Sequence, residues 1–116
     1  MTSHKRGDVV LVLFPNSDLV SFKRRPAIVV EANALNTGLA QTVIAMSTSN
    51  LARKGHPSRA FISLNSQMAK EAGLRTDSIV MTDNLATILD KAIVARLGHI
   101  PEMTAIDNAL RATLAI

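Results

Sequence analysis

Residues 8–14 read Asp-Val-Val-Leu-Val-Leu-Phe, a run that is almost entirely apolar and rich in β-branched side chains. Gly7 precedes this run and Pro15 ends it, so turn-forming residues bound it on both sides. A short apolar run with such boundaries is typical of a buried β-strand. The start of the chain is therefore predicted to form a buried strand, and later segments of the chain must supply the strands that pair with it.

Other apolar runs, separated by turn residues, predict the partner strands. They cover residues 27–30, which follow Pro26, and residues 39–46, 59–64 and 78–82, the last continuing toward Ile88. The segments between them have loop chemistry. These are a polar and basic loop at 15–25, a turn at 33–38, a polar segment at 47–50 and a basic loop at 51–58.

Helix signals are concentrated in the second half of the chain. Asn65 or Ser66 can cap a short helix that runs to Ala72 and stops at Gly73, and Asp90 can cap a helical turn that Gly98 ends. The clearest helix covers residues 102–115, where one apolar stripe is formed by Met103, Ile106, Leu110 and Leu114. Short strands followed by helices predict a mainly β or α+β fold, a small antiparallel barrel or sheet with helices attached, in one domain over residues 1–116.

The composition limits where the protein acts. The chain has 116 residues, 47% of them hydrophobic, and no cysteine. It can therefore build a core, but it can form neither disulfides nor thiolate metal sites. No apolar run approaches the roughly 20 residues that a membrane span needs, and the run at 9–14 is too short for a signal peptide. We expect a cytoplasmic protein without a membrane partner.

The positive charge is concentrated in the first half of the chain. The formal net charge is +4; residues 1–59 carry eight Lys and Arg against three Asp and Glu, whereas residues 60–116 carry five against six. A basic patch borne by loops suits a polyanion such as nucleic acid or an acidic peptide, although a solvated surface has the same composition. With three Phe and no Tyr or Trp, a stacking platform for bases is not expected.

The familiar catalytic constellations are absent from the sequence. There is no Gly-rich phosphate loop, no His-rich metal-ligand spacing and no pair of carboxylates at helical spacing. The sequence therefore predicts neither a metal nor another cofactor, and an enzyme built from this chain works with Arg, Thr, Ser, His or single carboxylates.

Arg24 and Arg25, directly before Pro26, are the sharpest candidates for such chemistry. Guanidinium groups bind phosphate in a bidentate manner and stay charged, so they can stabilise the extra charge of a phosphorane. A solvated pair, or a pair bound to a carboxylate such as Asp18, remains an alternative.

Other polar candidates follow predicted strands or lie in the second basic loop. Hydroxyls of Ser47, Thr48 and Ser49 can bind phosphate oxygens or position a 2′-OH, but such clusters also cap turns. Asp83 is a candidate general base or a turn former. His56, inside the basic loop, is a candidate for proton transfer or a structural residue.

Four segments in order resemble the MazF/PemK (Kid) family of toxin endoribonucleases. They are Arg6-Gly7-Asp8-Val9-Val10-Leu11-Val12, Lys23-Arg24-Arg25-Pro26-Ala27-Ile28-Val29, Met46-Ser47-Thr48-Ser49-Asn50 and Gly73-Leu74-Arg75-Thr76-Asp77-Ser78-Ile79-Val80. The resemblance covers about residues 6–115. It implies an SH3-like antiparallel barrel with peripheral helices and a C-terminal helix, and a homodimer. It also implies metal-independent cleavage of single-stranded RNA at short motifs, which slows translation, and neutralisation by a cognate antitoxin.

By the same resemblance, Arg25 matches the catalytic arginine and Thr48 the catalytic threonine or serine. The implied reaction is attack of the RNA 2′-OH on its own phosphate, which leaves a 2′,3′-cyclic phosphate and a 5′-OH. Asp83 and His56 are the candidates for the unassigned base. Residues expected to bind RNA around this set are Lys23, Arg24, Ser47, Ser49, Arg53 and Lys54.

The chain departs from the family where some members have arginine. These positions are Met81, two residues before Asp83, and the segment 84–87 that includes Ala86. The predicted catalytic set therefore rests on Arg25 and Thr48. Two alternatives from other classes are a non-catalytic toxin of the CcdB kind, which binds DNA gyrase through its C-terminal helix, and a non-toxic SH3-like binding module.

Overall fold

The computed structural model describes residues 4–16, 18 and 20–116; residues 1–3, and Ser17 and Leu19 of the predicted loop 15–25, lie outside the described residues. The elements in chain order are β1 (Asp8–Pro15), β2 (Phe22–Val29), β3 (Gln41–Thr48), β4 (Arg59–Ile62), α1 (Gln67–Glu71), β5 (Ser78–Leu89), the 3₁₀ turn η1 (Asp90–Ala92), β6 (Ile93–His99) and α2 (Thr104–Leu114). No helix of this described part is long and apolar enough to cross a membrane.

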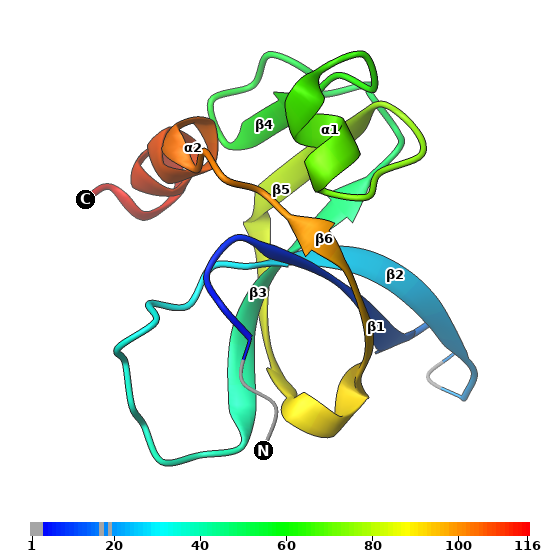
Figure 1. Ribbon diagram of the computed structural model, residues 1–116, viewed down its shortest axis with the longest axis vertical. Coiled ribbons are helices and arrows are strands. Elements are labelled where there is room, and N and C mark those ends of the chain that lie inside the picture. Colours follow the sequence, from blue (N-terminus) through cyan, green and yellow to red (C-terminus); the bar gives the residue numbers. More distant parts are fainter. Residues whose placement is uncertain (1–3, 17, 19) are drawn as a thin grey trace.

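The six strands form one antiparallel sheet in the order β4-β5-β3-β2-β1-β6. Figure 1 shows the sheet curling on itself, with α1 and α2 gathered at the end that carries β4. The predicted antiparallel, mainly β architecture with attached helices is confirmed. The expected closure into a barrel is not: β4 and β6 stand at the two ends of the strand order, and no ladder of the described residues joins them.

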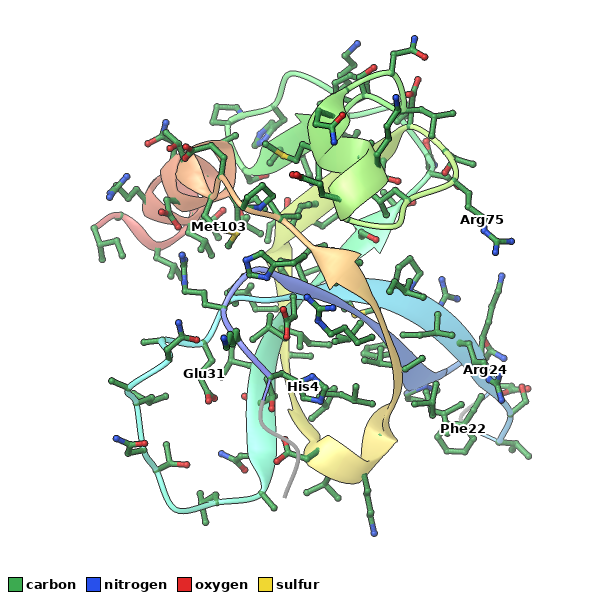
Figure 2. The ribbon with its side chains drawn as sticks, viewed as in Figure 1. His4, Phe22, Arg24, Glu31, Arg75 and Met103 are labelled. Atoms are coloured by element: carbon green, nitrogen blue, oxygen red, sulfur yellow. The ribbon has the colours of Figure 1, made fainter. Side chains whose placement is uncertain are left out.

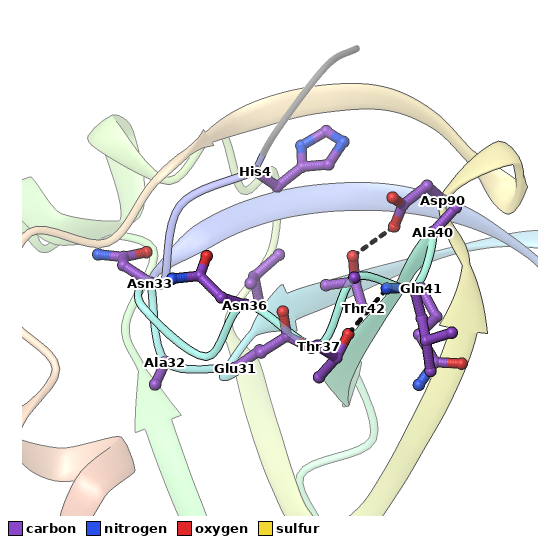
Figure 3. A pocket seen from close by; sticks show the side chains of 13 residues that line it. His4, Glu31, Ala32, Asn33, Asn36, Thr37, Ala40, Gln41, Thr42 and Asp90 are labelled. Carbon is purple, nitrogen blue, oxygen red and sulfur yellow. Dashed lines mark hydrogen bonds between the residues drawn. The ribbon is translucent and has the colours of Figure 1, made fainter.

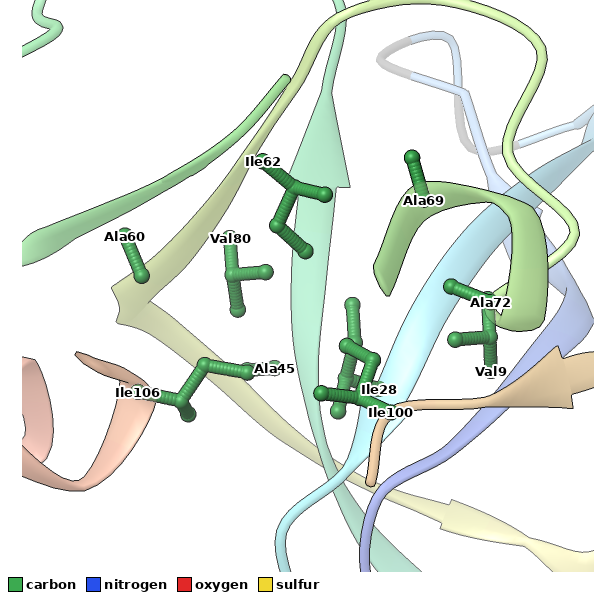
Figure 4. Packing of buried hydrophobic residues seen from close by; sticks show 10 residues of the cluster. All are labelled: Val9, Ile28, Ala45, Ala60, Ile62, Ala69, Ala72, Val80, Ile100 and Ile106. Carbon is green, nitrogen blue, oxygen red and sulfur yellow. The ribbon is translucent and has the colours of Figure 1, made fainter. Parts of the chain in front are cut away.

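Two apolar clusters lie on opposite faces of the sheet. The helix-side core is shown in Figure 4 and consists of Val9, Ile28, Ala45, Ala60, Ile62, Ala69, Ala72, Val80, Ile100 and Ile106. The inner core, enclosed by the curled strands, consists of Val10, Val12, Ala27, Val29, Ile44 and Met46. Successive side chains of a strand point to opposite faces, so β1 and β2 feed both clusters. This double burial is why residues 9–12 are apolar without alternation, whereas Leu13 beyond them is exposed.

The C-terminal helix closes the helix-side core. α2 packs on β4 and β5 and buries Ile106 and Ala109, so the predicted apolar stripe is confirmed at its centre. Its predicted end differs, because the Leu114 side chain is 50% exposed. Arg6 fastens the helix to the sheet: its Nη2 lies 2.6 Å from Asp107 Oδ1 and its Nε donates to the carbonyl of Val30 at 3.0 Å.

The short helix agrees with its predicted limits. The Ser66 side chain caps α1 by accepting a hydrogen bond from the backbone N–H of Ala69 at 3.1 Å. Gly73 follows the helix with φ of +71°, in the left-handed region where glycine carries no steric penalty. The capping signals in the sequence were therefore sufficient for this element.

Two predicted loop segments belong to strands. β2 begins at Phe22, so residues 23–25 pair with residues 12–14 of β1 and the loop is shorter than the predicted 15–25. β3 continues to Thr48, which pairs with Ile79 of β5. Both corrections have the same cause: a neighbouring strand supplies backbone partners, and the polar side chains stand at the exposed end of the sheet.

The predicted helical turn does begin at Asp90, but its predicted end at Gly98 is wrong. Only residues 90–92 form a 3₁₀ turn, and Ile93–His99 is strand β6, which pairs with the otherwise free edge of β1. Gly98 does not end a helix. A Cβ at this position would collide with the backbone of Glu71 and Ala72, so the glycine lets β6 pass against α1.

We expect Ile106→Ala to lower the free energy of unfolding by about 2–5 kcal/mol, because the side chain is 2% exposed and its loss leaves a cavity under α2. Leu114→Ala, on the same helix but half exposed, should change it by less than about 0.5 kcal/mol. Urea unfolding of the two variants measures the difference. Equal effects would contradict the docking of α2 described here.

Candidate functional site

Arg25 and Thr48 line the same hollow, although they come from different strands. The hollow has a volume of about 390 Å³ and is lined by Phe14, Pro15, Asn16, Arg25, Met46, Ser47, Thr48, Met81 and Asn84. It exists because β2 and β3 pair only over residues 27–29 and 44–46 and then separate. Arg25 is exposed and shares its strand face with Ala27 and Val29 of the inner core. The arginine therefore lies at the solvent-exposed end of the inner core.

The two hydroxyls at the end of β3 have different surroundings. Ser47 is 8% exposed and donates to the carbonyl of Pro26 at 3.2 Å, which extends the contact between β3 and β2 beyond their last paired residues. Thr48 is half-buried, and its Oγ1 accepts from the backbone N–H of Asn50 at 3.1 Å. The hydroxyl hydrogen of Ser47 is thus used in a bond to β2. The hydroxyl of Thr48 acts as an acceptor in its bond to Asn50, so its hydrogen can be donated to another acceptor.

A bulge in β5 brings a carboxylate to the adjoining part of the surface. Met46 of β3 pairs with Met81, but the preceding Ala45 pairs with Leu85, so residues 82–84 have no partner on β3. Bulges re-aim side chains and are common beside active sites. Asp83 lies in this bulge, and its Oδ2 accepts from Ser58 Oγ at 2.8 Å and from Arg59 Nε at 3.1 Å.

These contacts set the charge of Asp83. Partial burial opposes its ionisation, but the hydrogen bonds from Ser58 and Arg59 and the positive charge of Arg59 outweigh it, so the pKa of Asp83 is lowered. A carboxylate that stays ionised near neutral pH is a charged acceptor rather than a well-matched general base. The predicted role of Asp83 as a base therefore has little support from its surroundings.

A second hollow of about 430 Å³ adjoins the first and holds His56. Its lining residues are Arg53, His56, Arg59, Met81, Asp83 and Asn84. Met81 and Asn84 line both hollows, so the two lie side by side; together they are called here the groove. The structure thus places Arg25 and Thr48 in one of two adjoining hollows and Asp83 and His56 in the other.

The residues expected to bind RNA are distributed unevenly around the groove. Arg53 lines it, and Lys23 shares the strand face of Arg25 by alternation. Arg24 projects from the other face of β2; Figure 2 shows it at the outer end of this strand. The ammonium of Lys54 lies 4.0 Å from the centre of the Phe61 ring, a cation–π contact that engages it outside the groove. Ser49 follows β3 and is exposed.

Arg59 and Asn84 line the groove and Ser58 lies buried beside it, but none of the three was a candidate site residue in the sequence. Ser58 and Arg59 meet Asp83 across 25 and 24 residues of chain, and Asn84 belongs to the bulge. Arg59 counted only toward the basic charge, and Ser58 showed no signal at all. Such contacts depend on the pairing of β4 with β5, which residue spacing does not reveal.

Another hollow, of about 410 Å³, lies between the N-terminal segment and loop 31–40 and is shown in Figure 3. It contains none of the predicted site residues. Its polar side chains hold the fold together: Thr42 donates to Asp90 at 2.6 Å, and Glu31 accepts from the backbone N–H of Val43 at 3.3 Å. Within the described part of the chain, no group of three His, Cys, Asp or Glu residues is arranged to hold a metal ion.

A family model of PemK-like, MazF-like toxins of type II toxin–antitoxin systems matches residues 5–114, nearly the whole chain. The chain belongs to this family. The match spans all four segments that carried the resemblance, and it includes both halves of the groove. A comparison with curated proteins gave no match.

Solved structures of MazF toxins and related endoribonucleases share the fold. An endoribonuclease from Mycobacterial species is 24% identical with a TM-score of 0.75, covering 100% of this chain and 95% of that one. An endoribonuclease in complex with its cognate antitoxin, also from Mycobacterial species, is 22% identical with a TM-score of 0.74, covering 98% and 97%. The MazE–MazF complex (Form-III) from Deinococcus radiodurans is 19% identical with a TM-score of 0.73, covering 99% of each chain.

The lowered pKa of Asp83 predicts a pH-dependent stability. Because the pKa is lower in the folded than in the unfolded chain, the ionised group stabilises the fold above the unfolded value of about 4, and this contribution is lost as the pH falls through the folded pKa. Asp83→Asn should therefore lower the melting temperature at pH 7 but much less at pH 3. A deficit of equal size at both pH values would contradict the contacts of Asp83 described above.

Proposed function

We propose that the protein is a metal-independent endoribonuclease that cleaves single-stranded RNA and thereby inhibits translation. The observation that carries this proposal is the convergence of Arg25 and Thr48, from separate strands, on one hollow. Membership of the PemK/MazF-like toxin family supports it, as do the endoribonucleases among the solved structures with the same fold.

The chemistry follows from the two side chains. A ribose 2′-OH attacks the adjacent phosphorus, the bond to the 5′ oxygen breaks, and the products are a 2′,3′-cyclic phosphate and a 5′-OH. Arg25 supplies fixed positive charge where the non-bridging oxygens gain negative charge. Thr48 donates its hydroxyl hydrogen to one of these oxygens, since its Oγ1 already accepts from Asn50. Arg53 and Lys23 hold flanking phosphates by charge.

A cognate antitoxin is the second partner that we propose. Several of the solved structures with this fold are complexes with a cognate antitoxin or with MazE. The groove carries Arg25, Arg53 and Arg59 against the single carboxylate Asp83. An acidic, partly disordered antitoxin segment suits this charge, and it would lie across the loop at 51–58 and the hairpin between β1 and β2.

We also propose a homodimer that acts in the cytoplasm. Its support is the family resemblance together with large apolar side chains that this chain leaves exposed. Among them are Leu89 at the end of β5 and Val94 and Leu97 on the edge strand β6. A second copy covering such side chains would remove apolar surface from water.

We expect Arg25→Ala and Thr48→Ala each to slow RNA cleavage by about 10²–10³, the usual cost of losing one donor to a transition state. Arg111→Ala is the matched control, because this exposed arginine lies on α2 outside the groove and its guanidinium donates to Asn108 of the same helix. Initial rates on a defined RNA, with melting temperatures to verify folding, measure the effects.

EDTA should leave wild-type cleavage unchanged, and the 3′ end of the product should carry a cyclic phosphate. Abolition by EDTA would contradict the metal-independent mechanism. Full growth arrest by a folded Arg25→Ala variant would instead favour a non-catalytic toxin that binds gyrase.

Antitoxin association should slow as salt rises, because the Debye length falls from about 30 Å at 0.01 M to about 3 Å at 1 M. Arg53→Glu should reduce the rate at low salt more than Arg111→Glu, which makes the same charge change on α2. Stopped-flow measurement with the cognate antitoxin tests this. Rates that do not depend on salt would show that the groove is not the docking surface.

A further inference from the structure

Met81 forms an apolar floor where the two hollows of the groove adjoin. It pairs with Met46 of β3, and both methionines line the hollow that also holds Arg25 and Thr48. Met46 is 2% exposed and belongs to the inner core, whereas Met81 packs against that core and is only partly buried. Part of the Met81 side chain is therefore apolar surface that the groove exposes to a ligand.

Asn84 brings an amide to the edge of this floor. It lies in the β5 bulge, three residues after Met81, and like Met81 it lines both hollows. Residues 82–84 have no partner on β3, so the bulge sets the direction of this side chain independently of strand alternation. Asn84 is exposed, and its amide offers one oxygen acceptor and two N–H donors. An amide in this position suits a ligand that presents donors and acceptors side by side.

A nucleobase fits this pair of side chains better than a phosphate does. A thioether donates no hydrogen bond and an amide carries no charge, whereas guanidinium groups that suit phosphate lie in both hollows, Arg25 in one and Arg53 and Arg59 in the other. A base has flat aromatic faces, and methionine sulfur makes favourable contacts with aromatic rings. The edges of a base carry the donors and acceptors with which an amide can pair.

A single amide distinguishes the bases when it contacts the edge that carries N7 in the purines. Adenine presents the acceptor N7 beside the donor N6 on this edge, so an asparagine makes two hydrogen bonds with it. Guanine presents two acceptors there, N7 and O6, and each pyrimidine has a single hydrogen-bonding group on the corresponding edge. These bases leave one group of the amide unpaired, whichever way the amide is turned. An asparagine that contacts this edge therefore favours adenine.

We propose that Met81 and Asn84 form a subsite for the nucleobase next to the scissile phosphate, and that Asn84 makes adenine the preferred base at this position. The proposal rests on the proposed ribonuclease function. The base lies with one face on Met81, its N7 accepts a hydrogen bond from Nδ2 of Asn84, and its N6 amino group donates to Oδ1. Neither residue touches the reacting atoms. They determine which phosphates of an RNA reach Arg25 and Thr48.

The position of this subsite connects it to the proposed cleavage site. Met81 and Asn84 line the same hollow as Arg25 and Thr48, so a base bound to the first pair lies beside a phosphate bound to the second. Met81 is also the position at which some members of the family have arginine. An arginine would add positive charge to the hollow, whereas methionine leaves an apolar surface on which a base can lie. The departure from the family pattern therefore suits base recognition.

The decisive experiment removes N7 from the substrate. Wild-type protein first cleaves an RNA with randomised positions, and sequencing of the products should show adenine at one position next to the cut, favoured about 5- to 100-fold over guanine. A defined RNA is then prepared with either adenine or 7-deazaadenine, in which a C–H group replaces N7, at that position. Wild-type kcat/KM should fall about 3- to 10-fold on the 7-deaza substrate, the usual cost of one hydrogen bond. Asn84→Leu should cleave both substrates at the same, lower rate.

Asn108→Leu is the matched control, because it makes the same change at an exposed asparagine of α2, outside the groove. This variant should retain the wild-type difference between the two substrates. Melting temperatures verify that both leucine variants fold.

The contact with Met81 is tested by removing the whole base. Met81→Ala should lower kcat/KM about 2- to 10-fold on the adenine substrate, since the contact of sulfur with the ring is lost. On an RNA with an abasic nucleotide at the same position, it should cleave at the wild-type rate. Because Met81 packs against the inner core, Met81→Gln, which is polar but of similar length, replaces the alanine variant if that variant unfolds.

The possible failures can be told apart. A wild-type protein that cleaves no RNA would contradict the proposed function itself. If wild-type protein cleaves RNA without preferring adenine next to the cut, or if Asn84→Leu retains that preference, the subsite is wrong and the ribonuclease proposal stands. Equal wild-type rates on adenine and 7-deazaadenine would overturn the contact with N7. A Met81→Ala variant that is equally slow on the abasic RNA would assign Met81 to the fold rather than to the base.

Discussion

The bulge in β5 is the constraint on which the groove depends. If β5 paired regularly with β3, its side chains would continue to alternate between the two faces of the sheet. Residues 82–84 would then be paired with residues of β3. Because Met81 and Leu85 pair with adjacent residues of β3, the bulge leaves Asp83 and Asn84 free to face the groove while Thr82 turns into the interior. Thr82 then fixes the carbonyl of Ser58, so the start of β4 is set by the same irregularity.

The bulge also changes which residues of β5 face each core. Before it, Val80 belongs to the helix-side core and Met81 packs against the inner core; after it, Leu85 packs against the helix-side core and Ala86 and Ile88 against the inner core. Even-numbered residues therefore face the helix-side core before the bulge and the inner core after it. The residues of the bulge itself are released from this alternation, which is why Asp83 and Asn84 can line the groove.

Much of this architecture was predictable from the sequence, for physical reasons. The double burial of β1 appears as a continuous apolar run, and the caps of α1 appear as Ser66 and Gly73. Strand β6 was missed because Asp90 and Gly98 are residue types that also begin and end helices. The order of residues along the chain does not show that β1 has an unpaired edge with which β6 can pair. The ends of β2 and β3 were placed too short because polar residues such as Arg25 and Thr48 were taken for loop residues.

The candidate site was predictable in its members but not in its arrangement. The family resemblance pointed to Arg25 and Thr48, and the basic loop drew attention to His56. Nothing in the spacing of residues shows that Ser58 lies between His56 and Asp83, since that contact follows from the pairing of β4 with β5. The lowered pKa of Asp83, which follows from its hydrogen bonds to Ser58 and Arg59, is likewise a property of the folded chain alone.

The central claim is that one RNA strand is held along the groove with its phosphate at Arg25 and Thr48. A structure of the protein bound to an RNA with a 2′-deoxy nucleotide at the cleavage site tests this most directly, because that RNA binds but cannot be cleaved. We predict that the scissile phosphate lies in the hollow between β2 and β3 and contacts Arg25 and Thr48. A phosphate bound instead on the Arg24 face of β2, with the groove empty, would contradict the account.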